Sequence, residues 1–303
     1  MIDKHESITA KLCSFVRAFH SIYEKNKVFD DYLAYDLMGQ EEYIKVGQLI
    51  EHNFDVNLYD EKATFYKENV LHAVNSLMAP IVLSRIAYAE EKLKEFKKTH
   101  KKVQYVILGA GFDTFAFRNS DADIEVFELD HADTGRYKRK RVKELSLVIP
   151  DNLHFLSIDF NRESLDEVLL KGGFDRSVPS VFTILGVSYY LNLETFEQTL
   201  SLIDKVTDSD TLVIFDYPDE STFKTSDKRV TTLSAMTEKL GEKMIHGYSF
   251  SELENALNRH SFKVHENITP KIMDERYYSD HINSGMTAFP NVNILTGIKN
   301  VWD

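Results

Sequence analysis

Two glycines and an acidic residue follow predicted strands of this chain, at positions where they could bind a nucleoside. The apolar run from Val103 to Leu108 consists of strand-forming residues without a polar face, so it predicts a buried central strand of a parallel sheet. It stops at Gly109-Ala110-Gly111, where two glycines allow a tight turn and a close approach of a ligand to the backbone. In an open α/β sheet, ligands bind at that edge.

A second apolar run, Ile124 to Leu129, ends at Asp130. This position lies about 20 residues beyond the glycine turn, where an acid that binds a ribose is expected. Gly-x-Gly alone is a weak signal, because Phe115 or Ala116 replaces the third glycine of the dinucleotide fingerprint. A tight turn without a ligand is therefore the alternative. The turn and the acid together indicate a nucleoside site.

These motifs resemble those of the leucine carboxyl methyltransferase family, whose members are S-adenosylmethionine-dependent O-methyltransferases. The resemblance is carried by LGAGFDTFAFR and VFELDHADTGRYKRKR, and it extends to PIVLSRIAYAEEKL, FLSIDFNRESL, SVFTILGVSYYL and GYSFSELENALNRHSFKVHENITP. It covers nearly the whole chain. It implies S-adenosyl-L-methionine as the cofactor, an antiparallel seventh strand and a helical cap over the carboxyl ends of the strands.

Arg85 lies on or beside the apolar stripe of a long helix, where a charge without a partner is costly. In the family, the matching arginine grips the methionyl carboxylate of the cofactor, for which a guanidinium has the bidentate geometry. A salt bridge to Glu90 or another acid is the alternative. The family's acid at the position of Asp159 meets the adenine amino group, whereas a helix cap or a turn would also explain an acid there.

One position departs from the family pattern. The branch that methylates protein phosphatases has a glutamate in the cofactor pocket where this chain has Leu185, which argues against that branch's substrate. The cofactor contacts that the resemblance implies are Arg85, Gly109, Ala110, Gly111, Asp113, Asp130, Asp159, Phe160 and Leu185.

The acceptor decides whether the enzyme needs a base. A carboxylic acid, with a reference pKa of ~4, is ionised at neutral pH, whereas a phenol, at ~10, is not and needs a general base. The family name favours a small-molecule carboxylate, which Tyr190 would orient; for a hydroxyl acceptor, His246 and His281 are the candidate bases. We therefore expect an S-adenosylmethionine-dependent O-methyltransferase that acts on a carboxylate or hydroxyl oxygen of a small organic molecule.

Other functions fit less well. A nicotinamide-dependent oxidoreductase shares the glycine turn and the acid, but the missing third glycine and the Arg85 helix argue against it. A non-catalytic protein that binds S-adenosylmethionine is the alternative from another class. The chain has neither a Gly-Lys-Ser/Thr phosphate loop nor a His-Glu-x-x-His motif, and its 11 histidines show no metal-ligand spacing, so no metal is expected.

The composition favours a soluble, cytoplasmic protein. Of 303 residues, 43% are hydrophobic and 28% charged, and the net charge of −12 argues against a nucleic-acid partner. A basic cluster between Arg136 and Lys143 is interpreted as the solvated face of a helix. Cys13 is the only cysteine, so a disulfide framework is excluded. The first residues lack a signal peptide's apolar segment, and we expect no apolar stretch long enough to span a membrane. The oligomeric state stays open.

The first hundred residues predict the helices that must cover this site. Apolar residues at spacings of three and four from Ile8 to Ile22 indicate a helix, and Asp30 and Asp31 could cap a second, short helix that Gly39 ends. A long helix runs from Leu71 to Leu93, with Pro80 starting or kinking it. Aromatic residues between these helices serve packing or line a pocket: Tyr43, Phe54, Tyr59, Phe65 and Tyr66.

From residue 101 onward, predicted strands alternate with helices, which implies an α/β fold with a doubly wound sheet. The family resemblance implies that this sheet is mostly parallel and seven-stranded, in the Rossmann-like arrangement of class I methyltransferases. The further strands are expected at Leu153–Ile158, Val181–Leu185, Thr211–Tyr217, Phe262–Glu266 and Asn293–Ile298. We expect a single domain over residues 1–303, with a helical cap and cofactor-gripping helix in 1–100 and the core in 101–303. A charged insertion at about 218–248 could act as a lid.

Overall fold

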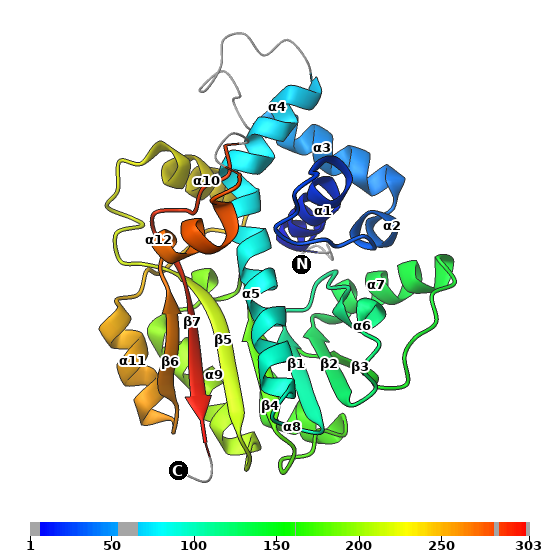
Figure 1. Cartoon of the computed structure of the whole chain (residues 1–303), viewed down its shortest axis with the longest axis vertical. Helices are drawn as coiled ribbons and strands as arrows, with labels where there is room; N and C mark the ends of the chain where they lie inside the picture. Colours follow the sequence, from blue (N-terminus) through cyan, green and yellow to red (C-terminus); the bar gives the residue numbers. More distant parts are fainter. Residues whose placement is uncertain (1–6, 54–65, 161, 282–284, 301–303) are drawn as a thin grey trace.

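The computed structural model describes residues 7–53, 66–160, 162–281 and 285–300. Its centre is one seven-stranded sheet with the order β3-β2-β1-β4-β5-β7-β6 (Figure 1). The first five strands are parallel, and β7 runs antiparallel to both of its neighbours, as expected. The strands are β1 Val103–Leu108, β2 Ile124–Asp130, β3 Leu153–Ser157, β4 Ser180–Ile184, β5 Thr211–Pro218, β6 Lys263–Ile268 and β7 Val292–Lys299.

The strand order reverses between β1 and β4, and this reversal positions the site. Strand β1 pairs with β2 on one side and with β4 on the other, with Ile107 opposite Thr183. The chain leaves the two strands in opposite directions, which opens a crevice at their carboxyl ends. The glycine turn follows β1 at this point.

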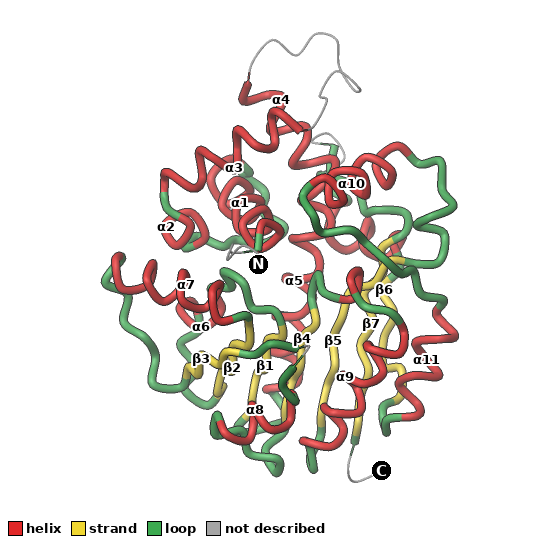
Figure 2. The backbone as a smooth tube through the Cα atoms, turned by 180° about the vertical axis from the view of Figure 1, so that it is seen from behind, coloured by secondary structure: helices red, strands yellow, loops and turns green. Residues whose placement is uncertain are grey.

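Both faces of the sheet are buried, which explains why every residue of β1 except Gln104 is an apolar or aromatic strand former. Val103 and its alternate neighbours pack on the side of α5 (Ala79–Lys97). Val106 and Leu108 face the core shared with α8 (Leu165–Lys171), α9 (Leu193–Val206) and α11 (Phe250–Arg259). Figure 2 shows these three helices in front of the sheet and α5 behind it. Because successive side chains of a strand point to opposite faces of the sheet, β1 contributes to both cores.

Four helices form the cap above the carboxyl ends of the strands (Figure 1). They are α1 (Ile8–Tyr23), α2 (Ala34–Met38), α3 (Gln40–Asn53) and α4 (Tyr66–Ala73). A π-helical turn, η2 (Val74–Met78), joins α4 to α5, and Pro80 lies in the first turn of α5, directly after this π-helical turn.

This continuous helix contradicts the expectation that no apolar stretch is long enough to span a membrane. The stretch Val70–Lys97 is long and apolar enough to cross a membrane by length and composition. However, 89% of its most apolar window is buried inside the structure. The helix owes its apolar character to its place in the core of the fold.

The cap departs from the sequence prediction at Asp31. Neither Asp30 nor Asp31 caps α2: the residue before the helix is Leu33, which makes no side-chain cap, and Asp31 is fully buried. Gly39 does end α2, with φ at +86°. Tyr43 serves packing, because its ring stacks on Phe15 at 4.5 Å. Phe54, Tyr59 and Phe65, and the side chain of Tyr66, lie outside the described residues.

The insertion between β5 and α11 lies beside the cap, above the same edge of the sheet (Figure 1). It contains α10 (Lys228–Lys239), and the Tyr248 amide donates to the Pro218 carbonyl at 2.9 Å, which closes its two ends. The remaining elements are α6 (Phe115–Arg118), α7 (Ala132–Glu144), η3 (Ser188–Tyr190), α12 (Pro270–Met273) and η4 (Asp274–Tyr278).

The basic cluster on α7 is only partly a solvated face. Arg136, Lys140 and Lys143 are exposed, but Lys138 is buried and its Nζ lies 2.5 Å from Glu128 Oε2 of β2. Burial raises the pKa of Glu128 to about 7, against the opposing charge of Lys138. The interpretation of the whole cluster as solvated was therefore wrong for Lys138, because only the packing of α7 on β2 places an acid beneath it.

We expect Lys138→Met to lower the free energy of unfolding by about 3–5 kcal/mol at pH 8, because it leaves a buried carboxylate without its partner. The loss should shrink at pH 6, where Glu128 becomes protonated. Urea denaturation of the wild type and the variant at pH 8 and at pH 6 would measure this loss. Lys140→Met, an exposed position on the same helix, is the control; equal losses for the two variants would contradict the prediction.

Candidate functional site

A cavity of about 450 Å³ lies at the carboxyl ends of β1 and β4. Its floor is the glycine turn and the end of β4, from Leu185 to Val187. Helix α1 of the cap forms one wall, and the loop Gly241 to Lys243 of the insertion forms another. The cavity thus joins the sheet, the cap and the insertion, which are far apart in the sequence.

The glycine turn requires its glycines. Gly109 and Gly111 have φ values of +76° and +53°, a region that other residues rarely adopt. The Gly109 and Ala110 amides both donate to the carbonyl of Leu129 at 2.9 and 3.0 Å, so β2 holds the turn in place. The backbone therefore forms a firm cavity wall that a ligand can approach closely.

Asp130 is fixed beside this turn. One carboxylate oxygen accepts from the Gly111 amide at 2.6 Å, and the other accepts from the His131 amide at 2.7 Å. Burial raises the pKa of Asp130, while these two backbone hydrogen bonds oppose the shift. A carboxylate has further acceptor sites, so Asp130 can still bind hydroxyl groups in the cavity.

Arg85 points into the cavity from α5. Its Nη1 lies 3.0 Å from Asp216 Oδ2 of β5, and its Nη2 lies 3.3 Å from the Cys13 sulfur. Its Nε is buried and has no hydrogen-bond partner among the described residues. Arg85 therefore does make the salt bridge to an acid that was the alternative, but to Asp216 and not to Glu90, because Glu90 binds Arg118 at 2.6 Å instead.

Asp216 organises this side of the cavity, although the sequence analysis did not single it out. Besides Arg85, it accepts from the Gly186 amide at 2.6 Å and from the Tyr189 hydroxyl at 2.9 Å. Gly186 has a φ of +73°, and a Cβ there would lie 2.7 Å from Arg85 Nη2. Only glycine therefore lets the guanidinium lie over the end of β4.

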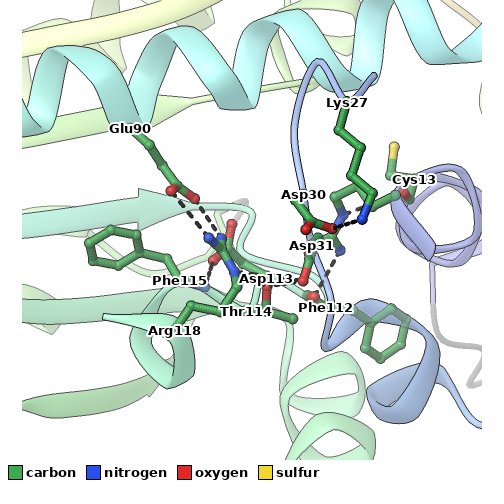
Figure 3. Close-up of polar contacts among 11 residues, drawn as sticks. Cys13, Lys27, Asp30, Asp31, Glu90, Phe112, Asp113, Thr114, Phe115 and Arg118 are labelled. Atoms are coloured by element: carbon green, nitrogen blue, oxygen red, sulfur yellow. Dashed lines mark hydrogen bonds and ion pairs between the residues drawn. The ribbon is translucent and has the colours of Figure 1, made fainter. Parts of the chain in front are cut away.

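A buried ionic network fastens the cap to the glycine turn (Figure 3). Asp31 is fully buried, and its Oδ2 accepts from Arg17 Nη1 of α1 at 2.5 Å. Its Oδ1 accepts from the Thr114 hydroxyl at 2.6 Å. Arg17 also donates to the carbonyl of Phe112 at 2.8 Å. Both contacts reach the segment that follows the glycine turn.

The same network continues to α5. Arg118 Nε donates to the Thr114 hydroxyl at 2.8 Å, and its Nη atoms hold both oxygens of Glu90 at 2.6 and 3.2 Å (Figure 3). Cap, glycine turn and the Arg85 helix are therefore linked by one chain of buried polar contacts.

Most of the expected cofactor contacts lie in the cavity. Its lining includes Arg85, Gly109, Ala110, Gly111, Asp113, Asp130, Leu185 and Tyr190. Asp159 and Phe160 do not line it, because they follow β3, which lies two strands away from β1. Asp159 Oδ2 lies 3.5 Å from Arg162 Nε, and half of Phe160 is exposed.

Neither candidate histidine lines the cavity. His246 packs edge-on against the ring of Tyr248 at 4.6 Å, where the insertion returns to α11. His281 is buried, with its ring 6.3 Å from that of His20. Of the three catalytic candidates, only Tyr190 lies in the cavity.

Glu242 is a cavity residue that the sequence reasoning missed, because nothing in its local pattern distinguishes it from other charges of the insertion. Its carboxylate accepts from the hydroxyls of Ser7, at 3.2 Å, and Thr9, at the start of α1. Burial raises its pKa, while the hydrogen bonds from Thr9 and Ser7 oppose the shift. The insertion and the cap therefore meet over the cavity at this carboxylate.

A second chamber of about 70 Å³ adjoins the cavity. The two share Thr9, Cys13, Arg85, Gly186 and Tyr190, so they meet at these residues. The rest of the chamber wall is mostly apolar and comes from α1, η2, α5 and α10. In the described part of the chain, no group of three or more His, Cys, Asp and Glu side chains could hold a metal ion.

Comparison with known proteins places this site in a family. Residues 10–204 match the leucine carboxyl methyltransferase family. YktD of Bacillus subtilis strain 168, provisionally named an S-adenosyl-L-methionine-dependent methyltransferase, is 31% identical over 306 residues, which cover 99% of this chain and 100% of that protein.

Two solved structures share the fold. A DUF574 family protein from Streptomyces avermitilis has a TM-score of 0.61 at 9% identity, with 99% of this chain and 100% of that chain covered. A protein from Thermobifida fusca, provisionally named a methyltransferase, has a TM-score of 0.58 at 11% identity, with 99% and 97% covered. At these identities the likeness concerns the fold alone.

We expect Asp31→Ala to lower the free energy of unfolding by about 3–5 kcal/mol, because Arg17 would be left buried without its carboxylate. The amides of the glycine turn should also exchange hydrogen faster, which mass spectrometry can follow. Asp30→Ala is the matched control, since Asp30 makes a half-exposed pair with Lys27 and should cost less than about 1 kcal/mol. Similar losses for both variants would refute the role of Asp31.

Proposed function

The chain belongs to the leucine carboxyl methyltransferase family and is an S-adenosylmethionine-dependent methyltransferase; we propose that its acceptor atom is an oxygen of a small organic molecule, in a carboxylate or a hydroxyl group. The observation that carries this proposal is the chamber beside the main cavity. A cofactor cavity that opens into a second, smaller chamber suits transfer to a small acceptor better than binding without catalysis. We also propose that the protein works in the cytoplasm.

The main cavity fits the cofactor on three observations. The positive φ values of Gly109 and Gly111 favour glycine, which has no side chain to fill the cavity there. Asp130 ends β2 with its carboxylate fixed, where it would hold ribose hydroxyls. Arg85 has a buried Nε without a partner among the described residues, and it would hold the methionyl carboxylate. Asp159 and Phe160 are left out of this assignment, since they do not line the cavity.

The bound cofactor supplies an electrophilic methyl group on a sulfonium. The chain's own task is to hold the acceptor oxygen in line with that group and to exclude water. Helix α1 and the loop Gly241 to Lys243 cover the cavity, which limits access of solvent. Tyr190 lines both the cavity and the chamber, so it lies where the acceptor would meet the methyl group.

A methyl-transfer assay tests the acceptor atom. We expect the protein, given S-adenosylmethionine with a labelled methyl group and a panel of carboxylic acids, phenols, alcohols, amines, thiols and carbon nucleophiles, to form S-adenosylhomocysteine and a labelled ester or ether. Mass spectrometry and NMR would identify the methylated atom. Transfer to nitrogen, sulfur or carbon nucleophiles alone would refute an oxygen acceptor.

Arg85→Lys tests the cofactor contact. Lysine keeps a cation opposite Asp216 but lacks the planar, bidentate donors of the guanidinium. The binding free energy of S-adenosylhomocysteine should therefore weaken by roughly 1–3 kcal/mol in titration calorimetry. The melting temperature should fall less than in Arg85→Leu, which leaves Asp216 buried and unpaired. Unchanged binding by Arg85→Lys would mean that the ion pair is purely structural.

A further inference from the structure

We propose that the acceptor is a neutral, apolar hydroxyl compound, a phenol or an alcohol, whose body occupies the chamber and whose hydroxyl proton passes to Glu242. This inference rests on the proposed function and narrows its acceptor class. It assigns the chamber to the substrate and gives Glu242 the part of general base.

The chamber wall selects for an apolar body. Three of its residues are methionines, Met78, Met236 and Met244, whose flexible side chains adapt to the shape of a ligand. Away from the residues that it shares with the cavity, its polar groups are already engaged: the Tyr189 hydroxyl donates to Asp216 at 2.9 Å, and the Thr237 hydroxyl donates to the Ser234 carbonyl at 2.9 Å. A polar body in that part of the chamber would lose its water without gaining new partners.

The charges around the chamber disfavour a carboxylate. Among the described residues that line it, Arg85 is the only cation; it is paired with Asp216, and in the proposed function its remaining donor is taken by the methionyl carboxylate of the cofactor. In the main cavity, Arg17 is bound to Asp31, and the mostly exposed Lys243 is bound to Glu238. An anionic acceptor would therefore be desolvated without a free cation. A hydroxyl compound avoids that cost.

Glu242 lines the cavity next to Thr9, one of the residues at which the chamber and the cavity meet. Thr9 lines both spaces, and its hydroxyl donates to Oε2 of Glu242, which itself lines the cavity. Ser7 donates to Oε1. The two oxygens of a carboxylate have about four acceptor sites, so these contacts leave room for a substrate hydroxyl. No cavity-lining histidine competes for this role in the described part of the chain.

The surroundings of Glu242 suit a base. The groups that face it are Ser7 and Thr9 of α1 and Tyr190 of η3, while its neighbour Lys243 pairs with Glu238. Burial raises the pKa of Glu242 above its ordinary value, which makes the carboxylate a stronger base. Burial, and then the charge of Glu242, raises the pKa of Tyr190 to about 12, so Tyr190 stays protonated and can only orient the acceptor.

The methyl transfer needs no reactant other than S-adenosylmethionine and the acceptor. The acceptor oxygen forms a bond to the methyl carbon while the bond from that carbon to sulfur breaks, and the electron pair of the broken bond stays on sulfur. The hydroxyl proton passes to Glu242. The products are a methyl ether, S-adenosylhomocysteine and a protonated Glu242, which returns its proton to solvent.

Matched probe pairs test the acceptor class. We expect protein saturated with S-adenosylhomocysteine to bind 4-methylphenol or hexan-1-ol at least tenfold more tightly than 4-methylbenzoate or hexanoate in calorimetry. The members of each pair share an apolar body and differ in charge. Tighter binding of the carboxylates, or binding of none of the four, would overturn the inference.

The variant Glu242→Gln tests the base. It keeps an oxygen that can accept from Ser7 or Thr9, so S-adenosylhomocysteine should bind as in the wild type. The turnover number with the hydroxyl probe should fall roughly 100-fold or more. In the wild-type protein this rate should rise with pH through the pKa of Glu242, and in the variant that rise should be lost. Glu220→Gln, an exposed position of the same insertion outside the cavity, should behave as the wild type.

The outcomes separate this inference from the proposed function. Methylation of the carboxylate probes alone, or a pH profile that Glu242→Gln leaves unchanged, would overturn the inference and leave an oxygen acceptor standing. Transfer only to nitrogen, sulfur or carbon would instead refute the proposed function. If Glu242→Gln does not fold, the pH profile of the wild-type protein decides, since a carboxylate base with a raised pKa must lose activity at acidic pH, and a rate that stays flat from pH 4 to pH 8 would exclude it.

Discussion

The geometry of the site depends first on the buried carboxylate of Asp31. It holds Arg17 of the cap with one oxygen and Thr114 with the other, and Arg17 in turn holds the carbonyl of Phe112. These charges are out of water, so the contacts persist only while all partners are in place. The cap is thereby fixed relative to the glycine turn. The cavity between them keeps a defined shape because of this network.

A second buried acid, Asp216, fixes the opposite side. It positions Arg85 and the Gly186 amide, and so determines how the guanidinium faces the cavity. Glu242 is different, because it belongs to the insertion and, among the residues that the structure describes, bonds only to hydroxyls at the start of α1. Asp31 and Asp216 therefore hold the structure together through cations, while Glu242 lines the cavity and has no paired cation in the described part of the chain. That difference is why we assign chemistry to Glu242 rather than to Asp31 or Asp216.

The sequence alone determined the sheet and the floor of the site. Buried strands have local signatures, so β1 lies where its apolar run predicted it, and the other strands differ by one or two residues at their ends. The glycine turn and Asp130 were predictable because a left-handed turn and a strand-ending acid are encoded in a few adjacent residues. Arg85 was found because a charge on an apolar helix face demands a partner, which the structure supplies as Asp216.

Only the tertiary structure decided the partners. Asp31 and Thr114 are 83 residues apart, and Thr9 and Glu242 are 233 apart, so no local pattern could pair them. The same reason explains why Lys138 was taken for a surface residue although it meets Glu128 on β2. The histidines are the converse case: a suitable residue type in an irregular segment says nothing about where its side chain points. The packing of cap and insertion over the sheet settles which polar groups reach the cavity.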